Sequence, residues 1–360
     1  LLSEYRNDLL LKNLGLIRFF ILALCVQYCL KKYQNEKLFL YTIVIITLFL
    51  AIDSLVQYLF GVNLFGNSIV GDHVTRRRLT SIFGNEQIVG SFLIKFIGLG
   101  LIGSFLLSNK NKVIALMYYA FISFIILVSQ ERMAFILLLF QLFLIFSFLL
   151  WQKKFKQTFS IILISFILSI IIFNSDTSLK YRYYSIFTNS SGIAAVDYDD
   201  DNKPINLIKS LRDIKNVTIK FEDSLWGAHY LTALQIFKNN FFLGSGPRSF
   251  RYECSKKKYE NLNINYIKKR CSTHPHNYYL EILSEIGILG FLFFSFILIS
   301  FYFRESKYYL QKRNLKHLCG LLSIFVNLWP IASTGSIYSS FNGTILWITI
   351  GYIISFSNKN

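Results

Sequence analysis

Nine apolar stretches recur along the chain, and each is close to the length that crosses a bilayer. They cover about 14–30, 38–60, 88–107, 113–129, 133–151, 158–173, 283–303, 315–334 and 343–356. A transmembrane helix needs about 20 apolar residues. Lipid excludes exposed irregular backbone, because its N–H and C=O groups would lose their hydrogen bonds. The sequence therefore predicts an all-α, polytopic transmembrane helical bundle with about nine visible helices.

The composition excludes several other classes of protein. Hydrophobic residues make up 53% of the chain and charged residues 16%, against about 25% charged in soluble domains, so a soluble enzyme and a disordered chain are both excluded. The net charge of +18 is confined to short runs between apolar stretches, so membrane lipids and no nucleic acid are the expected partners. Five cysteines without a C-x-x-C pair argue against a disulfide scaffold, a zinc site or thioredoxin chemistry.

The distribution of lysine and arginine predicts the orientation of the helices. Short odd-numbered connections carry thirteen of these residues, whereas short even-numbered connections carry only four, Arg76, Arg77, Arg78 and Arg132. Under the positive-inside rule the odd connections are cytoplasmic, which places residues 174–282 outside. The chain begins at Leu1 without a methionine, so we expect its true N-terminus to be missing. If the intact protein starts in the cytoplasm, an odd number of helices precedes this sequence.

One large outer loop containing short helices divides the chain. We expect N-terminal transmembrane helices in 1–173, a large outer loop with the functional residues in 174–282, and C-terminal transmembrane helices in 283–360. A connection of about a hundred residues is typical of a functional element. Within residues 174–280, 16 Lys+Arg against 10 Asp+Glu favour an anionic substrate at the membrane, such as a lipid-linked phosphate. An ordinary lysine-rich surface facing anionic lipid is the alternative.

Three further features of this loop carry expectations. Residues 224–242 have the spacing of an amphipathic helix, and the Gly244-Ser245-Gly246 turn is expected to be flexible and to deliver Arg248 and Arg251 to the membrane surface. Cys254 and Cys271 could form a disulfide worth about 3 kcal/mol in an oxidising compartment. The acidic run 197–201 contains D-x-D but no nearby histidine, so a solvated turn is favoured over a metal site.

The segment 273–281 (THPHNYYLE) is expected to open the helix that follows the loop. Thr273 or His274 would lie near the cap, and the helix dipole would keep a histidine there neutral, as a general base requires. Asn277, Glu281 and Glu285 would form one polar stripe on that helix, and carboxylates at membrane depth are a functional signal. The alternative for His276 is a capping or interface histidine.

These residues resemble the signature of the O-antigen ligase and O-antigen polymerase superfamily. His276-Asn277 is followed, nine residues later, by Gly287-Ile288-Leu289-Gly290. The resemblance extends to a bacterial subgroup of that family, and it covers most of residues 15–350. The resemblance to this subgroup rests on five further features of the sequence. They are the G-x-G turn before Phe250-Arg251, Cys254 with Cys271, residues 53–66, residues 78–91 and Glu131-Arg132.

The resemblance implies a membrane glycosyltransferase of about twelve helices, with its active site on the periplasmic side of the bacterial inner membrane. The donor would be a glycan on undecaprenyl pyrophosphate, the acceptor would be lipid A core or a lipid-linked glycan, and no metal or other cofactor would be needed. His276 would be the catalytic base. The implied substrate-binding residues are Arg182, Arg251, its competitor Arg248, Asn277, Glu281, Arg78 and Arg132.

Several alternatives remain open from the sequence. Arg182 could instead be a snorkelling interface residue, and Arg78, Glu86, Glu131 and Arg132 could form a structural ion pair. The function expected first is O-antigen ligase, and the alternative is an O-antigen polymerase that joins lipid-linked repeat units. A lipid-glycan transporter or flippase without transferase activity is more distant, because such folds usually contain internal repeats and this sequence has none in evidence.

Overall fold

The computed structural model describes residues 13–69, 78–151, 153, 155–174, 179, 183, 225–262 and 267–357. Within these ranges every regular element is a helix, and an isolated antiparallel bridge joins Val62 and Ser68. The prediction of an all-α helical bundle is confirmed. The chain divides into two compact units, of which one is built mainly from residues 34–188 and the other from residues 1–33 and 212–360.

In the described part of the unit built from residues 34–188, five helices follow one another along the chain. They are α3 (Glu36–Phe60), α4 (Val89–Leu107), α5 (Lys112–Val128), α6 (Arg132–Trp151) and α7 (Phe155–Asn174), with the 3-10 turn η1 at Ser81–Phe83. Each lies within about three residues of an apolar stretch that predicted it. Gly103 allows close packing of α4 on α3, because a Cβ there would collide with the backbone carbonyl of Leu40.

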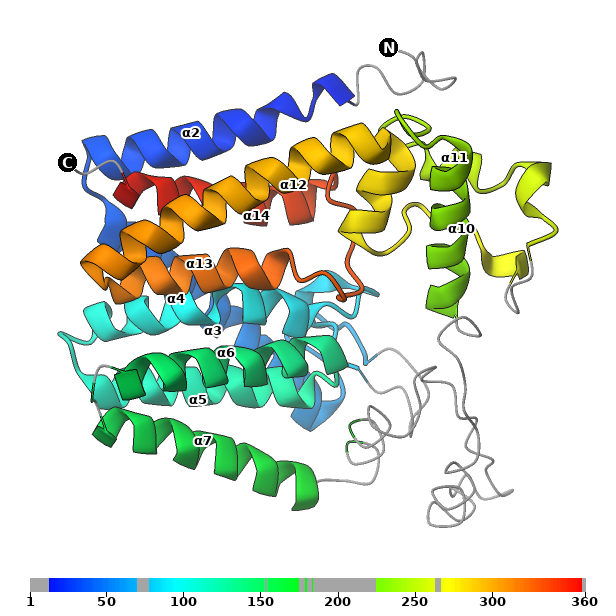
Figure 1. The fold of residues 1–360 in the computed structure, drawn as a ribbon. Helices are drawn as coiled ribbons and strands as arrows, with labels where there is room; N and C mark the ends of the chain where they lie inside the picture. The colour runs from blue at the N-terminus through cyan, green and yellow to red at the C-terminus, as the bar shows by residue number, and fades with distance from the viewer. Residues whose placement is uncertain are drawn as a thin grey trace, which may run out of the picture. The chain divides into compact units, whose positions relative to one another are not determined.

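The second unit combines four long helices with a small polar cap. The long helices are α2 (Ile17–Lys32), α12 (Tyr278–Lys312), α13 (Leu315–Asn327) and α14 (Ser340–Ser357), and they run side by side (Figure 1). The cap contains α10 (Leu225–Asn239), α11 (Phe250–Glu253) and the 3-10 turns η4 (Lys257–Tyr259) and η5 (Ile267–Lys269). α10 packs against the beginning of α12 and lies across the ends of the long helices (Figure 1). The amphipathic helix expected at 224–242 therefore corresponds to α10.

The helices have the length and surface of membrane spans. In the part of the chain that the structure describes, α3, α4 and α12 are long and apolar enough to cross a bilayer, and residues 112–128, 132–147, 315–327 and 340–356 are shorter apolar helices. On α12, Phe293, Phe296 and Phe303 are each at least two-thirds exposed. A row of exposed aromatic rings is unfavourable in water and favourable in lipid, so this is a membrane protein.

Two helix ends differ from the sequence expectation. α13 ends at Asn327 rather than near 334, because Pro330 disfavours helical geometry at Trp329 and cannot donate a helical hydrogen bond. α12 begins at Tyr278, and its cap is Asn277 rather than Thr273 or His274. The side-chain oxygen of Asn277 accepts from the N–H groups of Tyr279 and Leu280, as an N-cap does.

The two glycine motifs meet where α12 kinks. Gly287 has φ 67° and ψ −170°, which interrupts the helix, and the segment 241–246 passes beside it. Four hydrogen bonds join them: Ser245 N to Ser284 O, Gly246 N to Glu285 O, Ile288 N to Phe241 O and Leu289 N to Phe242 O, at 2.7–3.3 Å. The neighbouring segment thus satisfies backbone groups that the kink leaves without helical partners. The G-x-G turn is anchored here and is not the flexible turn that the sequence suggested.

We expect Gly287→Ala to destabilise the protein by about 2–4 kcal/mol, because this region of φ and ψ is nearly exclusive to glycine. A Cβ at Gly287 would also collide with the backbone of Phe242 and Gly244. The matched control is Gly66→Ala, since Gly66 has φ 86° but open space around it. Thermal unfolding in detergent measures both variants. Equal midpoints for the two variants would show that the close approach contributes nothing.

Candidate active site

His276 occupies a strained position immediately before the α12 cap. Its φ is 59°, a left-handed conformation that few residues other than glycine adopt. The backbone holds this conformation from two sides, because its carbonyl accepts from Thr334 N at 2.9 Å and from the Tyr230 hydroxyl at 3.4 Å. Strain of this kind is concentrated at functional sites.

Three aromatic side chains surround the His276 ring. Its centroid lies 4.2 Å from that of His274, 5.2 Å from that of His229 and 4.8 Å from that of Trp226. His229 and Trp226 come from α10, about fifty residues earlier in the chain, and sequence reasoning did not assign them to the site. The only available signal was their spacing, Trp-x-x-His, on one face of the predicted amphipathic helix.

Burial keeps these histidines neutral. Burial, and after it the neighbouring His274 and His229, lower the pKa of His276 to about 3, against an opposing contribution from the Thr334 backbone. Burial likewise lowers the pKa of His274 to about 4, with Arg251 and His229 acting in the same direction. The sequence argument attributed neutrality to the helix dipole, whereas burial is the larger cause. An imidazole that stays neutral at neutral pH can accept a proton.

The two histidines of the motif differ in their hydrogen bonds. His274 has Nδ1 2.8 Å from Thr273 Oγ1 and Nε2 3.2 Å from the Thr334 carbonyl oxygen. Both of its ring nitrogens are therefore engaged within the protein. His276 is the better candidate for a residue that accepts a proton from a bound molecule.

Arg248 and Arg251 follow the anchored G-x-G turn, but their environments differ. Arg248 has φ 63°, and its Nη2 donates to the Tyr338 carbonyl at 2.6 Å. Burial lowers its pKa, and the charges of Arg18 and Arg251 add to that effect. Arg251 is exposed, and among the described residues its guanidinium forms no hydrogen bond and no ion pair. Arg251 is thus available to an anion that binds close to His274 and Arg248.

The polar stripe of α12 holds the surrounding loops in place. Glu285 is fully buried, and its carboxylate accepts from Arg248 N at 2.5 Å and Phe250 N at 3.0 Å. Glu281 accepts from Ser336 Oγ at 2.5 Å and Ile337 N at 2.9 Å. Asn277, besides capping α12, donates from Nδ2 to the Pro330 carbonyl at 2.6 Å. These three side chains position the arginines and the histidine through the backbone.

The segment 328–339, between α13 and α14, links all of these groups. Its backbone and serine hydroxyls bond to Asn277, His274, His276, Glu281 and Arg248, through Pro330, Thr334, Ser336, Ile337 and Tyr338. The sequence analysis placed part of this segment inside an apolar span. Its Pro330 and the run Ser333-Thr334-Gly335-Ser336 were the signals that could have identified it as a loop.

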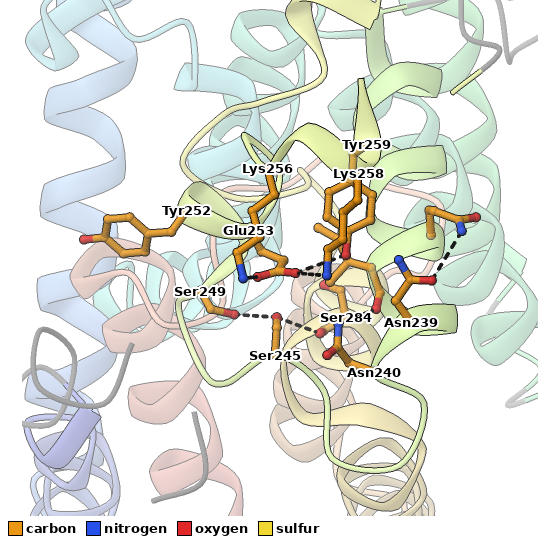
Figure 2. A network of polar contacts seen from close by, with 12 residues as sticks. Asn239, Asn240, Ser245, Ser249, Tyr252, Glu253, Lys256, Lys258, Tyr259 and Ser284 are labelled. Atoms are coloured by element: carbon orange, nitrogen blue, oxygen red, sulfur yellow. Dashed lines mark hydrogen bonds and ion pairs between the residues drawn. The ribbon is translucent and has the colours of Figure 1, made fainter. Parts of the chain in front are cut away.

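The cap that carries Arg251 has its own small core. Phe250, Cys254 and Tyr259 are fully buried against Ala233 and Ile236 of α10. Cys254 forms a disulfide with Cys271, with Cα atoms 5.4 Å apart. Buried Glu253 pairs with Lys256 at 2.8 Å and Lys258 at 2.7 Å, and Ser249, Ser245 and Ser284 form a chain of hydrogen bonds next to it (Figure 2). This packing fixes the short α11 and therefore the position of Arg251.

Comparison with known protein families matches residues 117–295 to the family described as O-Antigen ligase. The match, about half the chain, includes α10, the G-x-G turn, His276 and Gly287. The chain belongs to the O-antigen ligase superfamily. No curated protein and no solved structure matches the chain. Members of this superfamily are membrane glycosyltransferase-like enzymes, and the family implies lipid-linked glycan substrates in the membrane.

Two of the remaining arginines that the O-antigen ligase resemblance implied, Arg78 and Arg132, belong to the unit of residues 34–188. Glu131 accepts from Gly90 N at 2.6 Å and Ser91 N at 3.0 Å, so it caps the beginning of α4. Arg78 Nη2 donates to the Gln87 carbonyl at 3.0 Å, and its charge opposes the rise that burial causes in the pKa of Glu131. Arg132 begins α6. Arg182 and the acidic run 197–201 lie outside the described residues.

Proposed function

We propose that this protein is an O-antigen ligase, which transfers a glycan from undecaprenyl pyrophosphate to lipid A core on the periplasmic side of the bacterial inner membrane. The observation that carries the proposal is a half-buried, neutral His276, held in a strained conformation beside His274. Arg251 lies near His274, and within the described part of the chain its guanidinium pairs with no carboxylate. A base combined with exposed cations suits the departure of a pyrophosphate from a sugar. The charge asymmetry of the connecting loops supports the orientation.

In the proposed reaction His276 is the general base. It accepts the proton of an acceptor sugar hydroxyl as the hydroxyl oxygen forms a bond to the anomeric carbon of the donor. The bond between that carbon and the pyrophosphate oxygen breaks, and the electron pair leaves with the pyrophosphate. Arg251 and Arg248 stabilise the departing charge, since a guanidinium can donate two parallel hydrogen bonds to phosphate oxygens. Glu281 and Asn277 position these groups through the segment 328–339.

The proposal extends to three arginines beyond this cluster. Arg182, Arg78 and Arg132 are proposed as further contacts of the lipid pyrophosphate, as the family resemblance implies. The partners of Arg78 described above also suit a role in holding the beginning of α4. The reaction needs no metal ion in this scheme, because the arginines supply the positive charge.

Lipopolysaccharide profiling tests the proposal directly. A strain that lacks the gene, complemented with the full-length wild-type gene, is expected to attach polymer to lipid A core, and the uncomplemented strain to accumulate lipid-linked polymer of normal length. A strain that instead attaches a single repeat unit to the core would identify the protein as a polymerase. Normal attachment of polymer without the gene would contradict both functions.

A further inference from the structure

Arg18 lies in the first turn of α2, about 230 residues before the G-x-G turn. Its Nη2 donates to Ser340 Oγ, at the first residue of α14, at 2.8 Å. Close packing of the two helices holds α2 in place, because a Cβ at Gly343 would collide with the Phe19 ring and one at Gly351 with the backbone of Ala23. Arg18 is thus fixed at the beginning of α14, and the side chain as a whole is exposed.

The same short turn holds a second arginine of the site. Arg248 donates to the Tyr338 carbonyl at 2.6 Å, two residues before the serine that binds Arg18. The charges of Arg18 and Arg251 each lower the pKa of Arg248, after the larger effect of burial. The three guanidinium groups are therefore close enough to interact, although they come from three separate segments of the chain.

The charges around this cluster are not balanced. Among the described residues, none of the three arginines forms an ion pair with a carboxylate. Glu285 and Glu281 lie nearby, accept hydrogen bonds from Ser336, Ile337, Arg248 and Phe250, and raise the pKa of Arg248. Two carboxylates against three guanidinium groups still leave the cluster with a net positive charge. Arg18 also lies in the first turn of α2 and against the first residue of α14, where the helix dipoles disfavour a cation. A bound anion with more than one negative charge would compensate this arrangement.

We propose that Arg18 is the third arginine, with Arg248 and Arg251, of a site that binds the diphosphate group of a substrate. The inference rests on the proposed function for the identity of that substrate, a lipid-linked glycan. A diphosphate presents oxygens on two phosphorus atoms. One guanidinium group can therefore bind the phosphate beside the sugar, and another can bind the phosphate beside the lipid. Arg18 is a binding residue in this assignment and takes no part in proton transfer at His276.

Calorimetric titration of the purified protein with inorganic pyrophosphate, at low ionic strength in detergent, tests the site. We expect Arg18→Ala to weaken binding about tenfold or more, as loss of a charge-assisted hydrogen bond does. Arg18→Gln, which keeps a side chain that can bond to Ser340, should weaken it similarly, and it replaces Arg18→Ala if that variant fails to fold. Lys32→Ala, at the other end of α2, removes an equal charge and should bind as the wild type does.

The titration has outcomes that overturn the inference. Wild-type affinity in both Arg18 variants would remove Arg18 from the site, and orthophosphate binding as tightly as pyrophosphate would contradict a diphosphate site. Geranyl pyrophosphate, a soluble isoprenoid diphosphate, should bind at least as tightly as inorganic pyrophosphate if the ligand is lipid-linked, and much weaker binding would contradict that source.

The titration does not depend on glycan transfer. Binding of pyrophosphate that depends on Arg18, in a protein that fails the lipopolysaccharide test, would keep this inference and reject the proposed function. Normal attachment of polymer combined with Arg18-independent binding would do the reverse.

Discussion

His276→Asn is expected to reduce glycan transfer about a thousandfold, within the range that a positioned general base contributes, while membrane insertion stays intact. Asparagine is the informative substitution, because it tolerates the left-handed conformation that His276 adopts at φ 59°. It cannot act as a base at neutral pH. His276→Ala removes the same base but adds backbone strain, so the two variants separate chemistry from conformation.

The pH dependence of transfer gives a second readout for His276. Its pKa lies near 3 because of burial and the neighbouring His274 and His229, so the ring remains the neutral, proton-accepting form as the pH falls from 7.5 to 5. For a histidine with the ordinary pKa of about 6.5, the fraction of neutral imidazole would fall roughly thirtyfold between pH 7.5 and pH 5. We therefore expect kcat/KM to show no step near pH 6.5 that is caused by protonation of His276.

The His276 experiments need one control and have a clear contrary result. His274→Asn changes the adjacent ring, whose two nitrogens already bond to Thr273 and Thr334, and it should retain measurably more transfer than His276→Asn. Wild-type activity in His276→Asn, with protein levels in the membrane equal to those of the wild type, would reject His276 as the base.

The spans could be predicted from sequence because one physical requirement determines them. Lipid demands about 20 apolar residues whose backbone is fully hydrogen-bonded, and helices α3 to α7 and α14 follow that requirement within a few residues. This requirement does not predict the end of a helix where contacts with another segment determine that end. α13 stops at Asn327 although the sequence continues with apolar Leu328, Trp329 and Ile331.

The site was only partly predictable because its geometry comes from contacts between distant segments. The motif identified His276, Arg248 and Arg251 as residue types, but it could not show that Thr334 and Glu285 fix their backbones. The G-x-G and G-x-x-G motifs looked independent in the sequence. Their first glycines allow one close backbone contact, between 241–246 and the kink of α12.

Arg18 had no sequence signal at all. It lies in an apolar helix far from the motif, and only the packing of α2 on α14 brings it to Ser340. A single arginine near the end of a predicted span resembles an ordinary snorkelling residue. Three-dimensional structure was needed to distinguish it from Lys31 or Lys32 at the opposite end of the same helix.

Arg251→Lys is expected to lower kcat/KM for transfer about a hundredfold, comparable to the loss of one transition-state hydrogen-bond donor. The charge is retained, but an ammonium group cannot present two parallel donors to phosphate oxygens. The variant should fold normally, because Arg251 is exposed and its neighbours Phe250 and Cys254 supply the packing of the cap. Steady-state kinetics with a lipid-linked donor measure the effect.

Two comparisons decide what the Arg251 result means. Lys257→Ala removes an exposed charge from the same cap, and unchanged kinetics there would show that the loss is not a general effect of surface charge. Arg251→Ala removes both the charge and the paired N–H donors of the guanidinium. If Arg251→Lys retained wild-type kcat/KM while Arg251→Ala lost it, the side chain would act through its charge alone. That result would contradict the proposed two-donor contact to the leaving pyrophosphate, although a cation at this position would still be required.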